Sequence, residues 1–175
     1  RDALSQGKSA RTVELINKDE ELVAKETMLL TSKPVLYVCN VDENSAVNGN
    51  KYVEQVREAV KEENAQVLIV AAKIESEIAE LETYEEREMF LAEIGLSESG
   101  VSRLIKAAYA LLELRTFLTA GSDEVRAWTF KAGSKAPQCA GVIHADFERG
   151  FFGAEVIKYE DYIALGGESA CRAAG

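Results

Sequence analysis

The chain has 175 residues, of which 47% are hydrophobic and 29% charged, and this length allows one sizeable core or two small ones. The formal net charge is −10 at pH 7. Because phosphate backbones bind cationic surfaces, this acidic balance argues against a generic nucleic-acid binder, and any RNA contact has to be local.

The cysteines and the hydropathy pattern indicate a cytoplasmic protein. Cys39, Cys139 and Cys171 lack the spacing of a disulfide framework or a metal site, which favours a reducing setting. The single histidine, His144, cannot complete a zinc site with them, so we expect no metal site in the chain. No apolar run approaches the roughly 20 residues that a membrane span needs, so we expect no membrane contact.

Residues 1–30 predict a charged helix that Asn17 or Asp19 caps and that runs towards Leu30. Pro34 follows the helix, and the residue before a proline avoids the α conformation. The first residues have neither an initiator Met nor the apolar core of a signal peptide, so we expect the chain to be cut from a longer protein.

Two apolar, β-branched runs predict buried strands at residues 35–39 and 66–71. Between them, residues 51–63 carry apolar side chains at helical spacing. This order predicts a parallel βαβ unit with a right-handed crossover and with helices on both faces. The polar loops that follow the two strands then open on one edge of the sheet, where α/β proteins bind nucleotides.

Helical patterns follow at residues 76–94 and 100–112. Gly95 is expected to end the first helix, and Ser99 is expected to cap the second.

From Thr116 the pattern changes to short strands and turns. We expect strands at residues 125–130 and 152–157, with a glycine-containing turn at residues 131–135 after the first of them. This change of character places a domain boundary near Gly121-Ser122.

The loop Asn40-Val41-Asp42-Glu43 has the side chains of a base-recognition site. An Asn amide can bond the Hoogsteen edge of a purine, and an acid three residues later can accept from N1 and N2 of guanine. GTPases have Lys second and Asp fourth; here Val41 and the longer Glu43 replace them, so the fixed reach to guanine is lost. Adenine could be read through Asn40 and main-chain groups near Val41, while the amide of Ala72 and the stem of Lys73 line the base from the other side. The sequence therefore predicts a site that binds purines without strict selection for guanine. Taken alone, the four residues could also be an ordinary surface loop.

Four strings resemble one family, and the resemblance extends over nearly the whole chain: LLTSKPVLYVCNVDE, VLIVAAKIESEIAEL, SGVSRLIKAAYALLELRTFLTAG and EVRAWTFKAGSKAPQCAGVIHADFERGFFGAEVI. They are similar to the YchF subfamily of Obg-related P-loop NTPases, the Obg-like ATPases. The resemblance implies an α/β fold class, with the C-terminal half of a P-loop NTPase parallel sheet, its flanking helices and a partial β-grasp (TGS) domain. It assigns residues 1–30 to the end of a helical coiled-coil insert, 31–121 to the C-terminal half of the nucleotide-binding G domain, and 122–175 to an incomplete TGS domain.

The resemblance also implies the activity of the intact parent, which is hydrolysis of ATP or GTP with Mg²⁺. The family has a degenerate fourth guanine-recognition motif that ends in Glu, as Glu43 does here. Its phosphate loop and Mg²⁺ ligands precede the insert, and no GxxxxGK[ST] occurs in this chain. We therefore expect no catalytic residue or Mg²⁺ ligand here, and no hydrolysis by these residues alone.

Partners implied by the resemblance are a purine nucleotide and the ribosome or RNA, bound through the TGS and helical regions. A non-enzymatic RNA- or ribosome-binding adaptor is the alternative. His144 and Asp146 have no nucleophile or third orienting group nearby in the sequence, which favours a structural role over a catalytic pair. The candidate partner-binding residues are the cations of the last third of the chain: Arg126, Lys131, Lys135 and Arg149.

Overall fold

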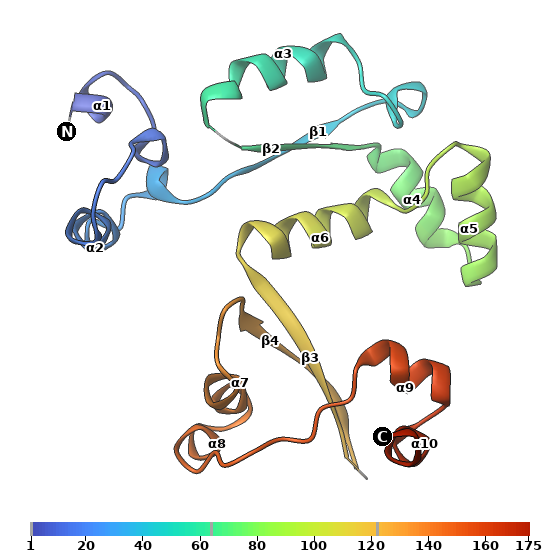
Figure 1. Ribbon diagram of the computed structural model, residues 1–175. Helices are drawn as coiled ribbons and strands as arrows, with labels where there is room; N and C mark the ends of the chain where they lie inside the picture. The colour runs from blue at the N-terminus through green and yellow to red at the C-terminus, as the bar shows by residue number, and fades with distance from the viewer. Residues whose placement is uncertain (1, 64, 122) are drawn as a thin grey trace. The chain divides into compact units, whose positions relative to one another are not determined.

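The computed structural model describes residues 2–63, 65–121 and 123–175. By its contacts the chain divides into two compact units, Arg1–Leu114 and Arg115–Gly175, and each is described here by itself. Figure 1 shows the helices and strands of both units. Within the described ranges, no helix combines the length and the apolar character needed to cross a membrane.

The first unit begins with short helices. They are α1 (Asp2–Ser5), the 3₁₀ turn η1 (Ala10–Thr12), α2 (Lys18–Glu26) and the 3₁₀ turn η2 (Leu30–Ser32). The side chain of Asn17 accepts a hydrogen bond from the N–H of Glu20 at 2.9 Å, so Asn17 is the cap of the predicted helix. The helix ends at Glu26 instead of continuing to Leu30, because Met28 takes a left-handed φ of 49°.

The chain before the first strand is fastened by a small polar network around Glu63. The guanidinium of Arg11 lies 3.1 Å from the Glu63 carboxylate and also donates to the carbonyl of Thr31. The hydroxyl of Tyr37 donates to the same Glu63 oxygen at 2.8 Å. These bonds tie η1 to the strand β1 (Leu36–Asn40) and to the 3₁₀ turn η4 (Lys61–Glu63).

The network predicts a stability that falls in acid. The hydrogen bond from Tyr37 and the contact with Arg11 hold the pKa of Glu63 below its ordinary value. A carboxylate whose pKa is lower in the folded state stabilises the fold above its unfolded pKa, and this contribution is lost as the pH falls below about 4.3. Urea denaturation between pH 7 and pH 3 measures the free energy of unfolding. In Glu63→Gln, this free energy should fall less in acid than it does in the wild type. Tyr37→Phe should reduce this acid-dependent loss of stability in part. If Glu63→Gln loses as much stability in acid as the wild type, the network does not contribute.

The predicted βαβ unit is confirmed. Strands β1 and β2 (Gln66–Val70) are parallel, with Leu36 opposite Gln66 and Asn40 opposite Val70. They are joined through the 3₁₀ turn η3 (Glu43–Ser45), helix α3 (Lys51–Ala59) and η4. The α3 helix begins where the Asn50 side chain accepts from the N–H groups of Tyr52 and Val53.

Helices cover β2 more completely than β1. Figure 1 shows α3 on one side of the strand pair and α6 (Gly100–Leu111) on the other, and both helices contact β2. Leu68 and Ile69 of β2 are buried, whereas Val38 of β1 stays 46% exposed. The expected coverage of both faces is therefore found at β2 and is incomplete at β1.

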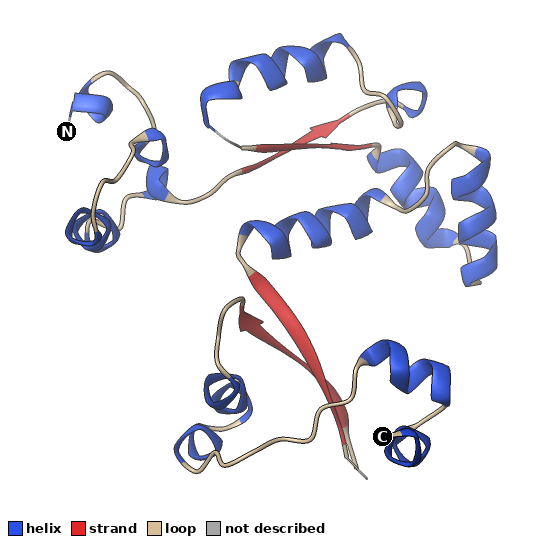
Figure 2. Cartoon of the chain, viewed as in Figure 1, coloured by secondary structure: helices blue, strands red, loops and turns tan. Residues whose placement is uncertain are grey.

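The single helix predicted at residues 76–94 is wrong, because two helices occupy the region: α4 (Ala72–Glu80) and α5 (Tyr84–Glu93). Leu81 is extended, and its carbonyl accepts two hydrogen bonds from the Arg87 side chain. Thr83 then starts α5 through a capping box with Glu86. Gly95, with φ of 77°, follows the end of α5, and Ser99 caps α6, as predicted. Figure 2 shows the break between the two helices.

The main buried cluster lies beneath the loops that follow β1 and β2. It contains Ala46, Ala71, Ile74, Ile78 and Leu91, and the side chains of Val41, Phe90, Ile94 and Leu96 pack against it. Ile74 of α4 is 1% exposed. The loops after the strands are therefore packed against this buried cluster.

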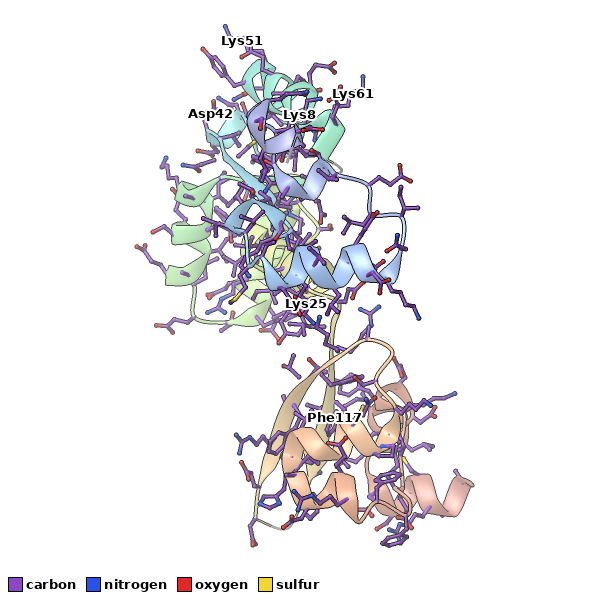
Figure 3. The ribbon with its side chains drawn as sticks, turned by 90° about the vertical axis from the view of Figure 1, so that its left-hand side faces the viewer. Lys8, Lys25, Asp42, Lys51, Lys61 and Phe117 are labelled. Carbon is purple, nitrogen blue, oxygen red and sulfur yellow. The ribbon has the colours of Figure 1, made fainter. Side chains whose placement is uncertain are left out.

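In its described residues, the second unit contains a two-stranded sheet and four helices; the strands are β3 (Leu114–Ala120), which begins at the last residue of the first unit, and β4 (Val125–Lys131). The helices are α7 (Ala136–Ile143), α8 (Ala145–Arg149), α9 (Tyr159–Leu165) and α10 (Glu168–Ala174). Phe117 of β3, labelled in Figure 3, lies 5.8 Å from Phe130 of β4 between ring centroids. These aromatic rings form part of the packing of the small sheet.

Predictions for the second unit had mixed outcomes. The strand at residues 125–130 and the turn after it, with Gly133 at φ 82°, are confirmed. The strand at residues 152–157 is wrong: no strand is hydrogen-bonded to this segment in the part of the chain that the structure describes, and Phe152 is fully exposed. The predicted domain boundary falls at Gly121-Ser122. Because Ser122 lies outside the described residues, this boundary stays a prediction.

Candidate functional site

The two polar loops meet where both strands of the parallel pair end. Asn40 closes β1 opposite Val70, which closes β2. The N–H of Val41 donates to the carbonyl of Val70 at 2.9 Å, so the hydrogen bonding between the two segments continues one residue beyond the end of β1. Residues 40–43 therefore lie beside the start of α4 at Ala72, as the βαβ prediction required.

Asn40 connects the loops directly. Its Oδ1 atom accepts a hydrogen bond from the backbone N–H of Ala72 at 3.0 Å. The cap residue of α4, Ala71, has no side chain that could accept such a bond, so Asn40 caps the helix from the neighbouring strand. With Oδ1 engaged, the amide NH₂ of Asn40 is the group left to donate to a ligand.

Asp42 shapes the loop that Asn40 begins. Its Oδ1 atom accepts from the N–H of Ser45 at 3.0 Å and caps η3, which starts at Glu43. Figure 3 labels Asp42 in this loop. Val41 is half-buried against the core cluster, and its N–H is taken by Val70. Asp42 was not among the predicted base-binding residues, and the structure gives it the role of a turn cap.

Lys73 and Glu43 bridge the two loops from the outside. The Lys73 Nζ atom lies 3.7 Å from Glu43 Oε2 and 3.7 Å from Glu77 Oε1. The Lys73 side chain is 76% exposed and that of Glu43 55%. All five predicted base-binding residues, Asn40, Val41, Glu43, Ala72 and Lys73, are thus gathered at one edge of the strand pair, and their contact with a base stays a prediction.

Glu75 is an unpredicted polar residue near this edge. Its carboxylate accepts from the N–H of Gly100 at 2.6 Å and from the N–H of Val101 at 3.1 Å, at the start of α6. A β-carbon at Gly100 would lie 2.8 Å from Glu75 Oε1, so a larger residue there would require the Glu75 carboxylate to shift. Glu75 therefore joins α4 to α6, a contact that requires the tertiary fold and leaves no local sequence signal.

A separate open hollow of about 960 Å³ lies in the first unit. Its lining comes from the N-terminal helices, together with residues such as Val35, Glu63 and Leu111. None of the five predicted base-binding residues lines it, so it is not part of the candidate site.

The predicted partner-binding cations are distributed over the second unit. The Arg126 guanidinium lies 4.2 Å from the centre of the Trp128 ring and 3.8 Å from Glu124. Side chains alternate along a strand, so Arg126 and Lys131 belong to opposite faces of β4. Lys135 precedes α7 and Arg149 ends α8, and all four cations are exposed.

His144 and Asp146 form a helix start. The Nδ1 atom of His144 accepts from the N–H of Asp146 at 3.2 Å and caps α8. This geometry agrees with the structural role inferred from the sequence. In the described residues, no three His, Cys, Asp or Glu side chains are grouped so that they could hold a metal ion.

Comparisons with known proteins extend over both units. A family model described as YchF-GTPase_C, a protein of unknown function (DUF933), matches residues 114–175. The chain is 55% identical to the ribosome-binding ATPase YchF of Bacillus subtilis, covering 100% of this chain and 48% of that protein. It is 41% identical to the human Obg-like ATPase 1, covering 98% of this chain and 44% of that one. The chain therefore spans about half the length of the curated relatives it matches.

A solved structure gives the same result for the fold. The Schizosaccharomyces pombe YchF GTPase matches with a TM-score of 0.78 and 33% identity, over 98% of this chain and 45% of that one. The likeness thus covers the α/β unit with its paired loops and the unit that follows, at identities well above those at which only a fold is shared. Residues 114–175 match the YchF C-terminal family, and the whole chain is similar to the proteins named YchF and Obg-like ATPase.

Proposed function

We propose that the chain supplies the purine-binding loops of a nucleoside triphosphatase that acts on ATP or GTP. The observation that carries the proposal is the hydrogen bond from Ala72 to Asn40, which fixes the two loops side by side. It leaves the Asn40 NH₂ as a donor at the edge of the sheet, and N7 of either purine is an acceptor for it. Relatives named ribosome-binding ATPase and Obg-like ATPase support this activity for the whole protein.

Adenine fits the proposed site without a specific partner for its N1 edge. Guanine has N1–H and N2–H₂ donors that a carboxylate can accept, whereas adenine has an acceptor at N1 and no N2 amine. Glu43 carries its carboxylate one methylene further from the backbone than the Asp of the GTPase pattern does. The proposed site therefore holds purines in general and tolerates adenine.

Hydrolysis requires groups that this sequence does not contain. No GxxxxGK[ST] phosphate loop occurs in it, and the described residues offer no carboxylate cluster for Mg²⁺. We assign no residue of this chain to the metal or to the reacting phosphate. The chain by itself is proposed to be inactive, with its part in the reaction limited to holding the base.

Calorimetric titration of the full-length gene product with ATP, GTP and CTP tests the proposal. We expect ATP and GTP to bind, and CTP to bind more weakly, because a pyrimidine has no N7 for Asn40. Failure of both purine nucleotides to bind would contradict the proposed function.

We further propose that the protein is cytoplasmic and binds the ribosome or its RNA. The relatives named ribosome-binding ATPases support this partner. In the proposed organisation, residues 1–30 end a helical insert, 31–121 complete a nucleotide-binding domain, and 122–175 are part of a TGS domain. The contacts are assigned to the helical and TGS regions, including the exposed cations Arg126, Lys131, Lys135 and Arg149.

A non-enzymatic adaptor is the competing proposal. Its support is the unit Arg115–Gly175, whose exposed cations and exposed apolar side chains, such as Val125 and Phe152, can bind a partner without any nucleotide. Ribosome co-sedimentation of the full-length gene product with and without ATP separates the two. Co-sedimentation that changes with ATP supports the ATPase, and indifference to ATP supports the adaptor.

A further inference from the structure

We propose that Lys73 is a specificity-determining residue, which favours adenine over guanine by holding the Glu43 carboxylate in an ion pair. This inference rests on the proposed function, because it concerns the base that the two loops bind. The pair joins residues from different loops: Glu43 begins η3 after β1, and Lys73 lies in the first turn of α4 after β2. A base held between the two loops would have its outer edge facing this ion pair.

Guanine has to compete with Lys73 for Glu43. The two donors of guanine, N1–H and N2–H₂, bond a carboxylate best when both of its oxygens are unshared. In the structure the Glu43 Oε2 atom is 3.7 Å from the Lys73 ammonium. Guanine can therefore be read by Glu43 only if this ion pair is given up or weakened.

Adenine leaves the ion pair in place. It has no donor at N1 and no N2 amine, so it gains nothing from a free Glu43 and is repelled by the lone pairs of an unpaired carboxylate. Lys73, which is also 3.7 Å from Glu77, offsets part of the negative charge of Glu43 and so reduces that repulsion. Specificity is a difference between two affinities, and here both contributions favour adenine.

The exposure of the pair sets the size of the effect. The side chains are 76% and 55% exposed, and exposed ion pairs contribute little. We therefore expect the ion pair to change the preference for ATP over GTP by about two- to five-fold. Because such pairs are screened by salt, the preference should also shrink at about 1 M ionic strength, where the Debye length is about 3 Å.

Lys73→Met in the full-length gene product tests the inference. It removes the ammonium and keeps most of the stem that would cover the base. Any effect of the lost charge on the triphosphate is common to ATP and GTP, so the ratio of their dissociation constants isolates the effect on the base. We expect the preference for ATP to fall by about two- to five-fold in titrations of both nucleotides.

Two further variants keep the test specific. Glu77→Gln removes the other carboxylate near Lys73, on the same helix, and should leave the ATP preference at least as large. In a Glu43→Gln background, Lys73→Met should have no effect on the ratio, because the carboxylate it controls is gone.

The outcomes are distinguishable from those of the proposed function. If the wild-type protein binds neither ATP nor GTP, the proposed function fails, and this inference fails with it. If the wild-type protein binds purines but the ratio is the same in Lys73→Met, only the role of Lys73 is overturned. An equal change of the ratio with and without Glu43 would also overturn it.

Discussion

Asn40→Ala in the full-length gene product is expected to weaken binding of ATP and GTP alike, by about tenfold or more. The substitution removes the amide NH₂ proposed to bond N7 and the acceptor that holds the N–H of Ala72. Because N7 is common to both purines, the ratio of the two affinities should change little. Isothermal titration of the variant with each nucleotide measures the effect.

Asn50→Ala is the matched control for Asn40→Ala. Asn50 caps α3 by accepting from the N–H groups of Tyr52 and Val53, and it is not one of the five predicted base-binding residues. Both variants lose a helix cap, and each is expected to lose about 1 kcal/mol of stability. Only Asn40→Ala should lose nucleotide affinity. Unchanged affinity in Asn40→Ala, or an equal loss in Asn50→Ala, would remove Asn40 from the site.

Ile74→Ala is expected to have the largest effect on stability, a loss of about 2–5 kcal/mol in the free energy of unfolding. Ile74 is 1% exposed and belongs to the buried cluster with Ala46, Ala71, Ile78 and Leu91. Truncation leaves a cavity beneath the start of α4, so the loops above it should also bind nucleotide more weakly. Urea unfolding monitored by circular dichroism measures the loss.

Met89→Ala on the neighbouring helix α5 is the control for Ile74→Ala. Met89 is also a large apolar residue in a helix, but it is 73% exposed. We expect its truncation to change stability by about 0.5 kcal/mol or less. If the two truncations cost the same, the buried cluster would not be the support of the loops.

The parts of the fold that were predictable are those that local patterns determine. Two apolar runs with a helical stripe between them give the parallel pair β1 and β2, because buried parallel strands need apolar side chains on both faces. Ser99, and Asn17 as one of two candidates with Asp19, are predictable as caps because a side-chain oxygen at a helix start satisfies a backbone donor within the next few residues. Such contacts lie within one turn of chain and can be seen in the sequence.

The missed features depend on neighbours that the local sequence does not specify. The helical pattern runs through Leu81, but the Arg87 side chain bonds its carbonyl and a capping box at Thr83 starts a new helix. The segment at residues 152–157 has the composition of a strand, and a strand also needs a partner to pair with.

The candidate site was predicted as a set of residues and not as a set of bonds. The strand ends identified Asn40 and Ala72 as neighbours, since carboxyl ends of parallel strands meet at one edge. That Asn40 caps α4 follows only from the register of the two strands. The bonds of Glu75 to Gly100 and Val101 join segments 25 and 26 residues apart, and no local pattern predicts them.

The central claim is that the loops after β1 and β2 hold a purine base. Amide hydrogen exchange of the full-length gene product, with and without ATP, tests it most directly. We expect ATP to slow exchange in peptides that cover residues 40–45 and 71–75, and Asn40→Ala to abolish this protection. Protection by ATP that leaves both of these segments unchanged would contradict the account.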